Sequence, residues 1–259
     1  MSLSLSNRCL QIAPSVTFAI DSRAKALRAK GVDVVGFGVG EPDFDTPEYI
    51  RKAAQRAMDE GKTHYTPVAG TLELREQVVR KLKEDNGLDY TPEQIIVSNG
   101  AKQSLFMALC AMINPGDEVL IPAPCWVSYP EMVRMAGGVP VMVMGREEDS
   151  FVVTAEMLAP HVTMRTKALI LNTPNNPNGC VYPKEVLRGI AELAVERGFY
   201  VISDEIYEKL IYDGEEHVSI ASFSDAIKEQ TLVVNGVSKT YAMTGWRIGY
   251  AAGPKALVK

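Results

Sequence analysis

The stretch GVSKTYAMTGWRIG (236–249) sets a lysine and an arginine among small and hydroxyl-bearing residues. Lys239 comes shortly after an apolar run, TLVV (231–234), that predicts a buried strand. A lysine that is desolvated and close to another cation loses its proton more easily, and its neutral amine attacks carbonyl compounds. Arg247 offers a planar fork for a phosphate. The alternative is a surface lysine whose apolar stem lies along the protein.

A second strand end carries carboxylates. Asp204 closes the run FYVISD (199–204), and Glu205 and Tyr207 follow. A carboxylate buried at the end of a parallel strand is costly unless a cation pairs with it. A protonated ring nitrogen is such a cation, and Asp204 would hold it charged. The alternative is a helix N-cap, because residues with helical spacing come next.

Two more predicted strands end in polar residues. IIVSNGAKQSLF passes through Gly100 and Ala101 into a predicted helix, whose free N–H groups can seat a phosphate. From this stretch alone, a plain strand-to-helix turn is the simpler interpretation. In LILNTPNNPNG, Asn176 is either a donor to a ligand or part of a tight polar turn.

These groups complement one another. They comprise a phosphate cradle, Asp204 for a pyridinium nitrogen, Tyr207 and Asn176 for a phenolic oxygen, and Lys239 for an aldehyde. Each motif alone is weak evidence, but the set fits pyridoxal phosphate.

The elements that must position these residues alternate between strand and helix. Helical segments separate most of the short apolar runs, which indicates crossover connections and a mostly parallel sheet flanked by helices, an α/β fold. In such sheets ligands bind outside the carboxyl ends of the strands. The predicted strands are 94–98, 118–122, 139–143, 167–172, 199–204, 231–235 and 248–253.

Composition narrows the class of protein. The 259 residues are 46% hydrophobic and carry a formal net charge of -5, which argues against a nucleic-acid partner. The three histidines have no metal-ligand spacing, so we expect no metal. The four cysteines form no CxxC pair, and we expect free, buried thiols in a reducing compartment. With no signal-peptide pattern or membrane-length apolar run, we expect a cytoplasmic protein.

Two parts are expected along the chain. Residues 1–45 are rich in turn residues after a helix-like start, and they would belong to a smaller domain and line the site. Residues 46–259 would form the large cofactor-binding domain. Because the sequence stops within PKALVK, at the predicted start of a helix, we expect the C-terminal part of the smaller domain to be missing.

Five motifs occur in an order that resembles one known family. They are GVGEPDFDTP, HYTPVAG, NTPNNPNG, SDEIYEKLIY and SKTYAMTGWRIGY, and they extend over nearly the whole chain. The sequence resembles the class I, fold-type I pyridoxal-phosphate aminotransferases, close to the bacterial aspartate aminotransferase branch. The resemblance implies the large domain of that fold and a homodimer with shared active sites.

The resemblance also implies roles at the cofactor ring. Lys239 would form the Schiff base and carry a proton to and from the substrate. Asp204 would pair with the ring nitrogen, and Tyr207 and Asn176 would hydrogen-bond the phenolic oxygen. Trp126, in APCWVSYP, would stack on the ring.

Further roles are implied around the phosphate and the substrate. Those at the phosphate fall to the predicted helix start and to the stretch after the strand at 231–235: Gly100, Ala101, Lys102, Ser238 and Arg247. Tyr65 would reach the phosphate in the neighbouring subunit. Gly40, with Trp126 and Asn176, would contact the substrate carboxylate. Without the family, core packing explains Trp126, a buried aromatic explains Tyr65, and a turn explains Gly40.

Three departures from the family pattern bear on function. Gly236 stands where many members carry a phosphate-binding serine, and Ala13 stands where prephenate-accepting members carry a lysine. The family's arginine for the substrate α-carboxylate would lie beyond Lys259.

We expect amino transfer from an L-amino acid, with aspartate and 2-oxoglutarate as the favoured pair. Lys102 is a candidate for reading the distal carboxylate, although an ordinary helix-surface lysine is the simpler interpretation. The alternatives are an aminotransferase for alanine or aromatic amino acids, a pyridoxal-phosphate lyase, and a non-catalytic cofactor-sensing module. The absence of a basic helix-turn-helix pattern before Thr46 argues against the last.

Overall fold

The computed structural model describes residues 4–13, 16–36, 38 and 40–259. Two stretches of interest are therefore partly outside the described residues: Pro14 and Ser15 follow Ala13, and Val39 lies within GVGEPDFDTP.

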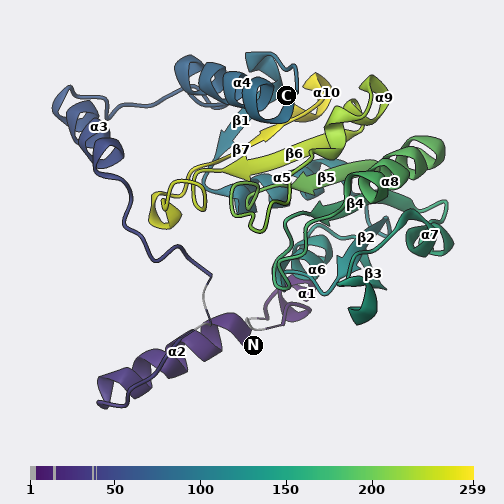
Figure 1. Cartoon of the computed structure of the whole chain (residues 1–259), viewed down its shortest axis with the longest axis horizontal. Coiled ribbons are helices and arrows are strands. Elements are labelled where there is room, and N and C mark those ends of the chain that lie inside the picture. The colour runs from purple at the N-terminus through teal and green to yellow at the C-terminus, as the bar shows by residue number, and fades with distance from the viewer. Residues whose placement is uncertain (1–3, 14–15, 37, 39) are drawn as a thin grey trace.

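One sheet forms the centre of the molecule, in the strand order β1-β7-β6-β5-β4-β2-β3 (Figure 1). Neighbouring strands run parallel except at β7, which is antiparallel to both β1 and β6. All seven predicted strands and the mostly parallel sheet are confirmed. The strands are β1 (Ile95–Ser98), β2 (Glu118–Ala123), β3 (Val139–Met144), β4 (Thr166–Asn172), β5 (Tyr200–Asp204), β6 (Thr231–Gly236) and β7 (Gly249–Ala252).

Helices cover both faces of this sheet. The α-helices of the described residues are α1 (Asn7–Leu10), α2 (Val16–Ala29), α3 (Glu48–Asp59), α4 (Leu72–Asn86), α5 (Ala101–Met112), α6 (Ser128–Met135), α7 (Ala155–Leu158), α8 (Lys184–Arg197), α9 (Asp225–Lys228) and α10 (Lys255–Val258). Short 3-10 turns lie at η1 (Pro92–Gln94), η2 (Glu147–Asp149), η3 (Ala159–His161), η4 (Ile220–Ser222) and η5 (Thr244–Trp246). In the part of the chain that is described, no helix has the length and apolar character needed to cross a membrane.

Alternation along the strands divides the core between the two faces. Ile170 and Ile202 belong to the cluster that contains α5 and α6 side chains. The adjacent residues Leu169 and Val201 belong to the cluster that contains α8 side chains. Successive strand residues point to opposite faces, so strands covered on both sides are continuously apolar. This burial explains why the runs were readable as strands.

The helix ends follow local rules. The Thr71 side chain accepts from the Leu74 N–H at the start of α4, and Gly87 ends the helix at φ 66, in the left-handed region. A third apolar cluster, which includes Val78 and Leu82 of α4, packs this helix against β1 and β7.

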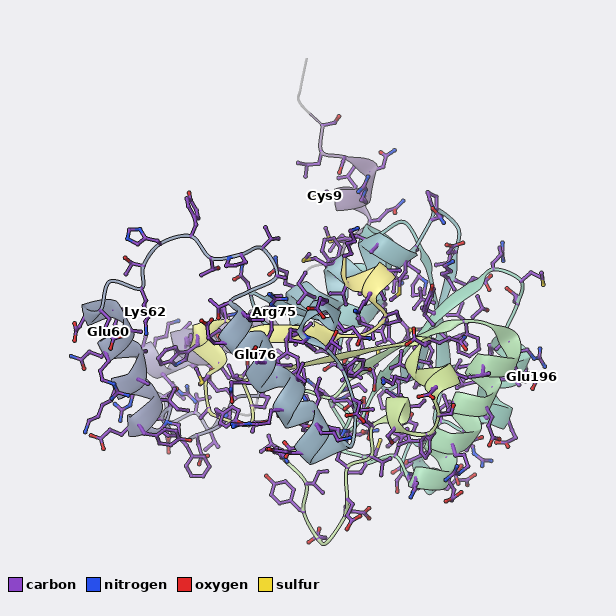
Figure 2. The ribbon with its side chains drawn as sticks, turned by 90° about the horizontal axis from the view of Figure 1, so that it is seen from above. Cys9, Glu60, Lys62, Arg75, Glu76 and Glu196 are labelled. Atoms are coloured by element: carbon purple, nitrogen blue, oxygen red, sulfur yellow. The ribbon has the colours of Figure 1, made fainter. Side chains whose placement is uncertain are left out.

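The helices α2 and α3 lie outside the sheet (Figure 1). In Figure 2 the ion-paired Glu60 and Lys62 lie at the outer end of α3. The proposed division at residue 45 stays a prediction. All four cysteines are free, but Cys9 (Figure 2) and Cys110 are exposed, so the expectation of burial is wrong for these two.

Candidate active site

The parallel strands β4, β5 and β6 place predicted site residues at the carboxyl-terminal end of the sheet. In the strand register Asn172 pairs with Asp204, and Asp204 pairs with Val234. Asn176, Tyr207 and Lys239 follow these three strands. The site therefore lies where the topology rule places ligands in parallel sheets.

Asp204 is a buried carboxylate, 3% exposed. The Tyr129 hydroxyl donates to its Oδ2 at 2.8 Å, and the Ile206 N–H donates to its Oδ1 at 3.2 Å. Burial raises the pKa of Asp204 to about 6, and these two hydrogen bonds oppose the rise. No described lysine, arginine or histidine forms an ion pair with it. The N-cap alternative is wrong, because residues 206–209 form a turn rather than a helix.

Asn172, the last residue of β4, hydrogen-bonds both the end of β5 and the loop that carries Asn176. Its Nδ2 donates to the backbone carbonyl of Asp204, and its Oδ1 accepts from the backbone N–H of Asn176, both at 2.8 Å. Asn176 Nδ2 in turn donates to the Tyr207 hydroxyl at 3.2 Å. Asn172 was not among the predicted site residues, although a polar residue at the end of the apolar run KALILN could have indicated it.

Lys239 is half-buried beside this group. Its Nζ donates to the carbonyl oxygen of Gly40 and lies 5.5 Å from the Tyr207 ring centroid. Burial lowers the pKa of Lys239; Glu41 opposes this effect, and Arg247 adds to it. The structure describes no ion pair of this amine. These surroundings differ from those of a solvated surface lysine, and they favour the neutral amine.

The Arg247 guanidinium lies against the start of α5. Gly100 precedes the helix at φ 87, and a Cβ there would collide with the Arg247 guanidinium. A Cβ on Gly249 would collide with the backbone of Gly100 and Ala101. The exposed helix N–H groups and the guanidinium can together hold an anion. Ser238 is buried and follows β6 by two residues.

Trp126 connects this cradle to Asp204. Lys102 Nζ lies 4.6 Å from the Trp126 ring centroid, and the ring meets that of Tyr129 edge to face at 5.4 Å. Burial and nearby Arg247 lower the pKa of Lys102. A cavity of about 460 Å³ borders this group; its lining includes Asn99, Lys102, Gln103, Phe106, Glu131 and Arg247.

One predicted site residue, Tyr65, does not contact the other site residues in this structure. The side chain of Tyr65 is fully exposed and makes none of the hydrogen bonds described for this chain. A role toward another subunit is neither tested nor contradicted by one subunit, and it stays a prediction.

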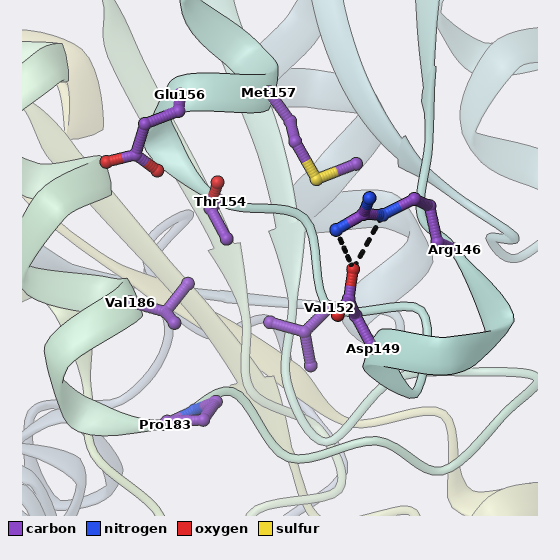
Figure 3. Close-up of a pocket in the computed structure, with 8 residues that line it drawn as sticks. All are labelled: Arg146, Asp149, Val152, Thr154, Glu156, Met157, Pro183 and Val186. Atoms are coloured by element: carbon purple, nitrogen blue, oxygen red, sulfur yellow. Dashed lines mark hydrogen bonds and ion pairs between the residues drawn. The ribbon is translucent and has the colours of Figure 1, made fainter.

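A larger cavity, of about 620 Å³, lies elsewhere (Figure 3). Arg146 and Asp149 form an ion pair at one side, and Met157 and Val186 contribute apolar surface. None of the predicted site residues lines it, so size alone does not identify the candidate active site.

A buried polar network lies behind Asp204. Glu205 accepts from Ser203 and Ser219 at 2.9 and 2.7 Å and contacts His217 Nε2 at 3.0 Å. Ligand atoms of Glu205, Glu208 and His217 lie within 4.8 Å of one another, but Glu208 already pairs with Lys81. Two carboxylates thus face Lys81 and His217, an arrangement that balances charge within the protein.

The residues present fit pyridoxal phosphate on three observations. Asp204 is a buried anion without a cationic partner among the described residues. Because Gly100 and Gly249 carry no side chain, the Arg247 guanidinium and β7 both lie close against the start of α5, where helix N–H groups and a guanidinium can face one anion. Lys239 presents a half-buried amine with a depressed pKa. A ring with a cationic nitrogen, a phosphate and an aldehyde matches these three features.

Comparison with known proteins places this geometry in a family. Residues 32–259 match the sequence profile of the family described as aminotransferase class I and II. The chain is 51% identical over 257 residues to an aspartate aminotransferase of Geobacillus stearothermophilus, covering 99% of this chain and 65% of that protein. It is 54% identical to an aspartate/prephenate aminotransferase of Thermus thermophilus, over 98% of this chain and 65% of the relative.

A solved structure agrees. The aspartate aminotransferase from Thermus thermophilus with maleate matches at a TM-score of 0.95 and 53% identity, covering 99% of this chain and 66% of that one. The chain thus spans about two thirds of the length of these relatives. With fold, motifs and profile in agreement, the chain belongs to the aminotransferase class I and II family.

Proposed function

We propose that the protein uses pyridoxal phosphate to transfer the amino group of an L-amino acid to a 2-oxo acid. One observation carries the proposal. The buried carboxylate of Asp204 ends β5, and the half-buried amine of Lys239 follows the neighbouring strand β6. Neither group has an ion-pair partner among the described residues. The names of the relatives support the same reaction class.

Each residue has a defined task in this proposal. Asp204 holds the ring nitrogen, Asn176 and Tyr207 hold the phenolic oxygen, and Trp126 covers one ring face. Gly100, Ala101, Lys102, Ser238 and Arg247 surround the phosphate. When bound, pyridoxal phosphate supplies an aldehyde and an electron-withdrawing ring.

Lys239 does the proton chemistry. Burial lowers the pKa of the tethered amine, which makes its neutral form more accessible, and a neutral Nζ can take the proton from the substrate Cα. Its hydrogen bond to the Gly40 carbonyl holds the amine beside the N-terminal part of the chain. Gly40, Trp126 and Asn176 are proposed to border the substrate carboxylate.

Aspartate and 2-oxoglutarate are the proposed substrates. Lys102 supports this choice, because its cation lies beside Trp126 and next to the 460 Å³ cavity, where it can meet a second carboxylate. Prephenate is a less favoured acceptor: a relative is named for it, but Ala13 stands where prephenate-accepting members carry a lysine. We also propose a homodimer in the cytoplasm, with Tyr65 reaching the partner's site.

The decisive experiment is half-transamination of the purified holoprotein. Aspartate, alanine and aromatic amino acids are each added, and the cofactor absorbance is followed until a 2-oxo acid restores it. We expect the fastest conversion with aspartate and recovery with 2-oxoglutarate. Repeated turnover of an amino acid other than alanine to pyruvate and ammonia, with no 2-oxo acid present, would identify a lyase. A cofactor band unchanged by every amino acid would identify a binding module.

Covalent attachment is tested separately with Lys239→Ala. Borohydride reduction and peptide mapping should find the cofactor on the Lys239 peptide of the unchanged protein and nowhere in the variant. Lys167→Ala is the matched control, because Lys167 Nζ also lies over a tyrosine ring, at 5.8 Å from that of Tyr200.

A further inference from the structure

Tyr129 occupies a position that the family resemblance did not assign. It is the second residue of α6 and is 2% exposed, with its ring directed into the core cluster between α6 and the sheet. Its hydroxyl donates to Asp204 Oδ2 at 2.8 Å. A buried tyrosine hydroxyl needs a partner, and here the partner is the carboxylate at the centre of the candidate site.

The surroundings of Asp204 make this hydrogen bond important. Ile206 supplies a backbone N–H at 3.2 Å, and Tyr129 supplies the side-chain donor. The adjacent Glu205 is satisfied by its own donors, Ser203 and Ser219. Within the described residues, Tyr129 is therefore the one side chain that hydrogen-bonds the Asp204 carboxylate.

The same ring also supports Trp126. The two rings meet edge to face, with centroids 5.4 Å apart and planes at 88°. Such contacts are directional, because the positive edge of one ring meets the negative face of the other. Tyr129 thus touches both the proposed partner of the ring nitrogen and the proposed ring-stacking residue.

We propose that Tyr129 is a positioning residue of the cofactor site, which orients Asp204, keeps it ionised and supports Trp126 against the cofactor ring. This inference rests on the proposed function, since it concerns how the same site is held. Tyr129 acts through these two residues and is not assigned a step in the chemistry.

The titratable groups around the pair set the expected pH dependence. Burial raises the pKa of Tyr129 well above its ordinary value, and the Asp204 charge raises it further, so the hydroxyl stays a donor. Tyr207 and Cys125 also face Tyr129, and Glu205 faces Asp204. Removing the hydroxyl leaves Asp204 a stronger base, so Asp204 should ionise only at higher pH.

The test compares Tyr129→Phe with Tyr182→Phe. Tyr182 is a matched control, because it is 3% exposed and its hydroxyl makes one hydrogen bond, accepting from the Val153 N–H at 3.3 Å. The Kd for pyridoxal phosphate is measured by titrating the apoproteins across pH. We expect Tyr129→Phe to weaken binding roughly tenfold or more, as for loss of a hydrogen bond to a charged group.

The pH profile separates positioning from general damage. In Tyr129→Phe the acid limb of the affinity should move to higher pH, while in Tyr182→Phe it stays where the unchanged protein has it. Equal effects of both substitutions, or no effect of Tyr129→Phe, would overturn the inference. If even the unchanged protein fails to bind pyridoxal phosphate, the proposed function fails instead.

A double-mutant comparison covers the case in which Tyr129→Phe folds poorly. Tyr129→Phe is added to Asp204→Asn, and thermal melting is recorded beside the Kd. If Tyr129 acts through Asp204, the double variant should bind the cofactor as weakly as Asp204→Asn alone. Fully multiplied losses would show that the hydroxyl acts independently of Asp204, contrary to the inference.

Discussion

At the residue scale, the apoprotein carries a destabilising charge at the place where the cofactor is proposed to bind. Asp204 is fully enclosed, with hydrogen-bond donors but no cation described beside it. Burying an ionised carboxylate costs free energy that a cationic partner recovers. The ionised carboxylate therefore lowers the stability of the apoprotein, while the proposed cofactor binding requires it. A substitution that removes the charge should raise stability and weaken cofactor binding.

Asp204→Asn should stabilise the apoprotein at high pH while weakening cofactor binding. Because the pKa is about 6 in the fold against an ordinary value of 3.8, the folded state holds the proton more tightly. The protonated Asp204 side chain therefore adds to the free energy of unfolding. This contribution is fully present below pH 3.8 and is lost as the pH rises through about 6. At pH 8 the asparagine variant should be more stable by up to about 3 kcal/mol.

Urea unfolding of both apoproteins at pH 4 and pH 8 measures this difference. We expect the free energies of unfolding of the variant and the unchanged apoprotein to differ less at pH 4 than at pH 8. We also expect the Kd for pyridoxal phosphate to be higher in the variant. A variant less stable than the unchanged protein at pH 8 would show instead that a cationic partner already stabilises the Asp204 charge in the apoprotein.

At the element scale, the start of α5 is held by its contact with β7. Gly249→Ala would drive a methyl group into the backbone of Gly100 and Ala101, so either the strand or the helix start must move. Because the exposed helix N–H groups are proposed to bind the phosphate, affinity for pyridoxal phosphate should fall by a factor of about 10 or more. Affinity for pyridoxal, which lacks the phosphate, should change much less.

Gly189→Ala on α8 is the control, since the added Cβ meets only Ala155 at an ordinary 3.5 Å. Alanine favours helix more than glycine does, so this variant should be as stable as the unchanged protein or more so. A loss of pyridoxal affinity equal to that of pyridoxal phosphate in Gly249→Ala would mean that the whole site, and not the phosphate cradle, is disturbed.

The turn after β5 depends on the buried Glu205–His217 pair. Burial works against the charged form of each, yet their contact raises the pKa of His217 and lowers that of Glu205. The contribution of Glu205 is present above its ordinary pKa of 4.5 and is lost on acidification. That of His217 is present below pH 6.5 and is lost as the pH rises through its higher folded pKa.

His217→Ala should therefore destabilise the protein most between pH 4.5 and 6.5, where both contributions are present. Leaving a buried carboxylate without its partner costs on the order of 3–5 kcal/mol. Denaturant unfolding from pH 5 to pH 9 gives the profile, with exposed His161→Ala as the control. A loss that does not vary with pH would indicate a packing defect rather than a broken ion pair.

The strands and helices could be predicted from the sequence more fully than the side-chain contacts between them. Strands buried on both faces leave continuous apolar runs, and glycines such as Gly87 mark helix ends, so the strands and main helices followed from pattern. Asp204 and Lys239 were identifiable because a charge at the end of a buried strand is unusual. Asn172 and Tyr129 were missed, since their partners are distant in sequence and their types are common in cores.

At the scale of the whole molecule, residues 40–46 make specific hydrogen bonds to the stretch that carries Lys239 and Arg247. Thr46 donates to the Ala242 carbonyl at 2.6 Å and accepts from the Trp246 indole N–H at 3.0 Å. Glu41 accepts from Thr244 at 3.1 Å, and Gly40 accepts from Lys239. Each of these hydrogen bonds has its partner in residues 239–246, the stretch that carries Lys239. A movement of the N-terminal residues would therefore change the position of the proposed catalytic amine.

Beyond these contacts, the segment formed by residues 44–68 presents apolar side chains to solvent. Tyr65 and Val68 are essentially fully exposed, and Phe44 and Tyr49 are 77% and 68% exposed. Exposed aromatic and aliphatic groups gathered on one segment are typical of an interface. A second copy of the chain is the partner that the proposed homodimer supplies, with Tyr65 entering the neighbouring site.

Mixing two defective variants tests this shared site. Tyr65→Ala keeps Lys239, while Lys239→Ala keeps Tyr65, and the two are unfolded together and refolded as mixed dimers. If Tyr65 serves the neighbouring subunit, a mixed dimer contains one site with both residues intact, so activity should exceed the sum of the separate variants. Tyr49→Ala in place of Tyr65→Ala is the control, because it removes an exposed tyrosine of the same segment. Activity no greater than the sum would place Tyr65 outside the neighbour's site and leave its exposure without a catalytic explanation.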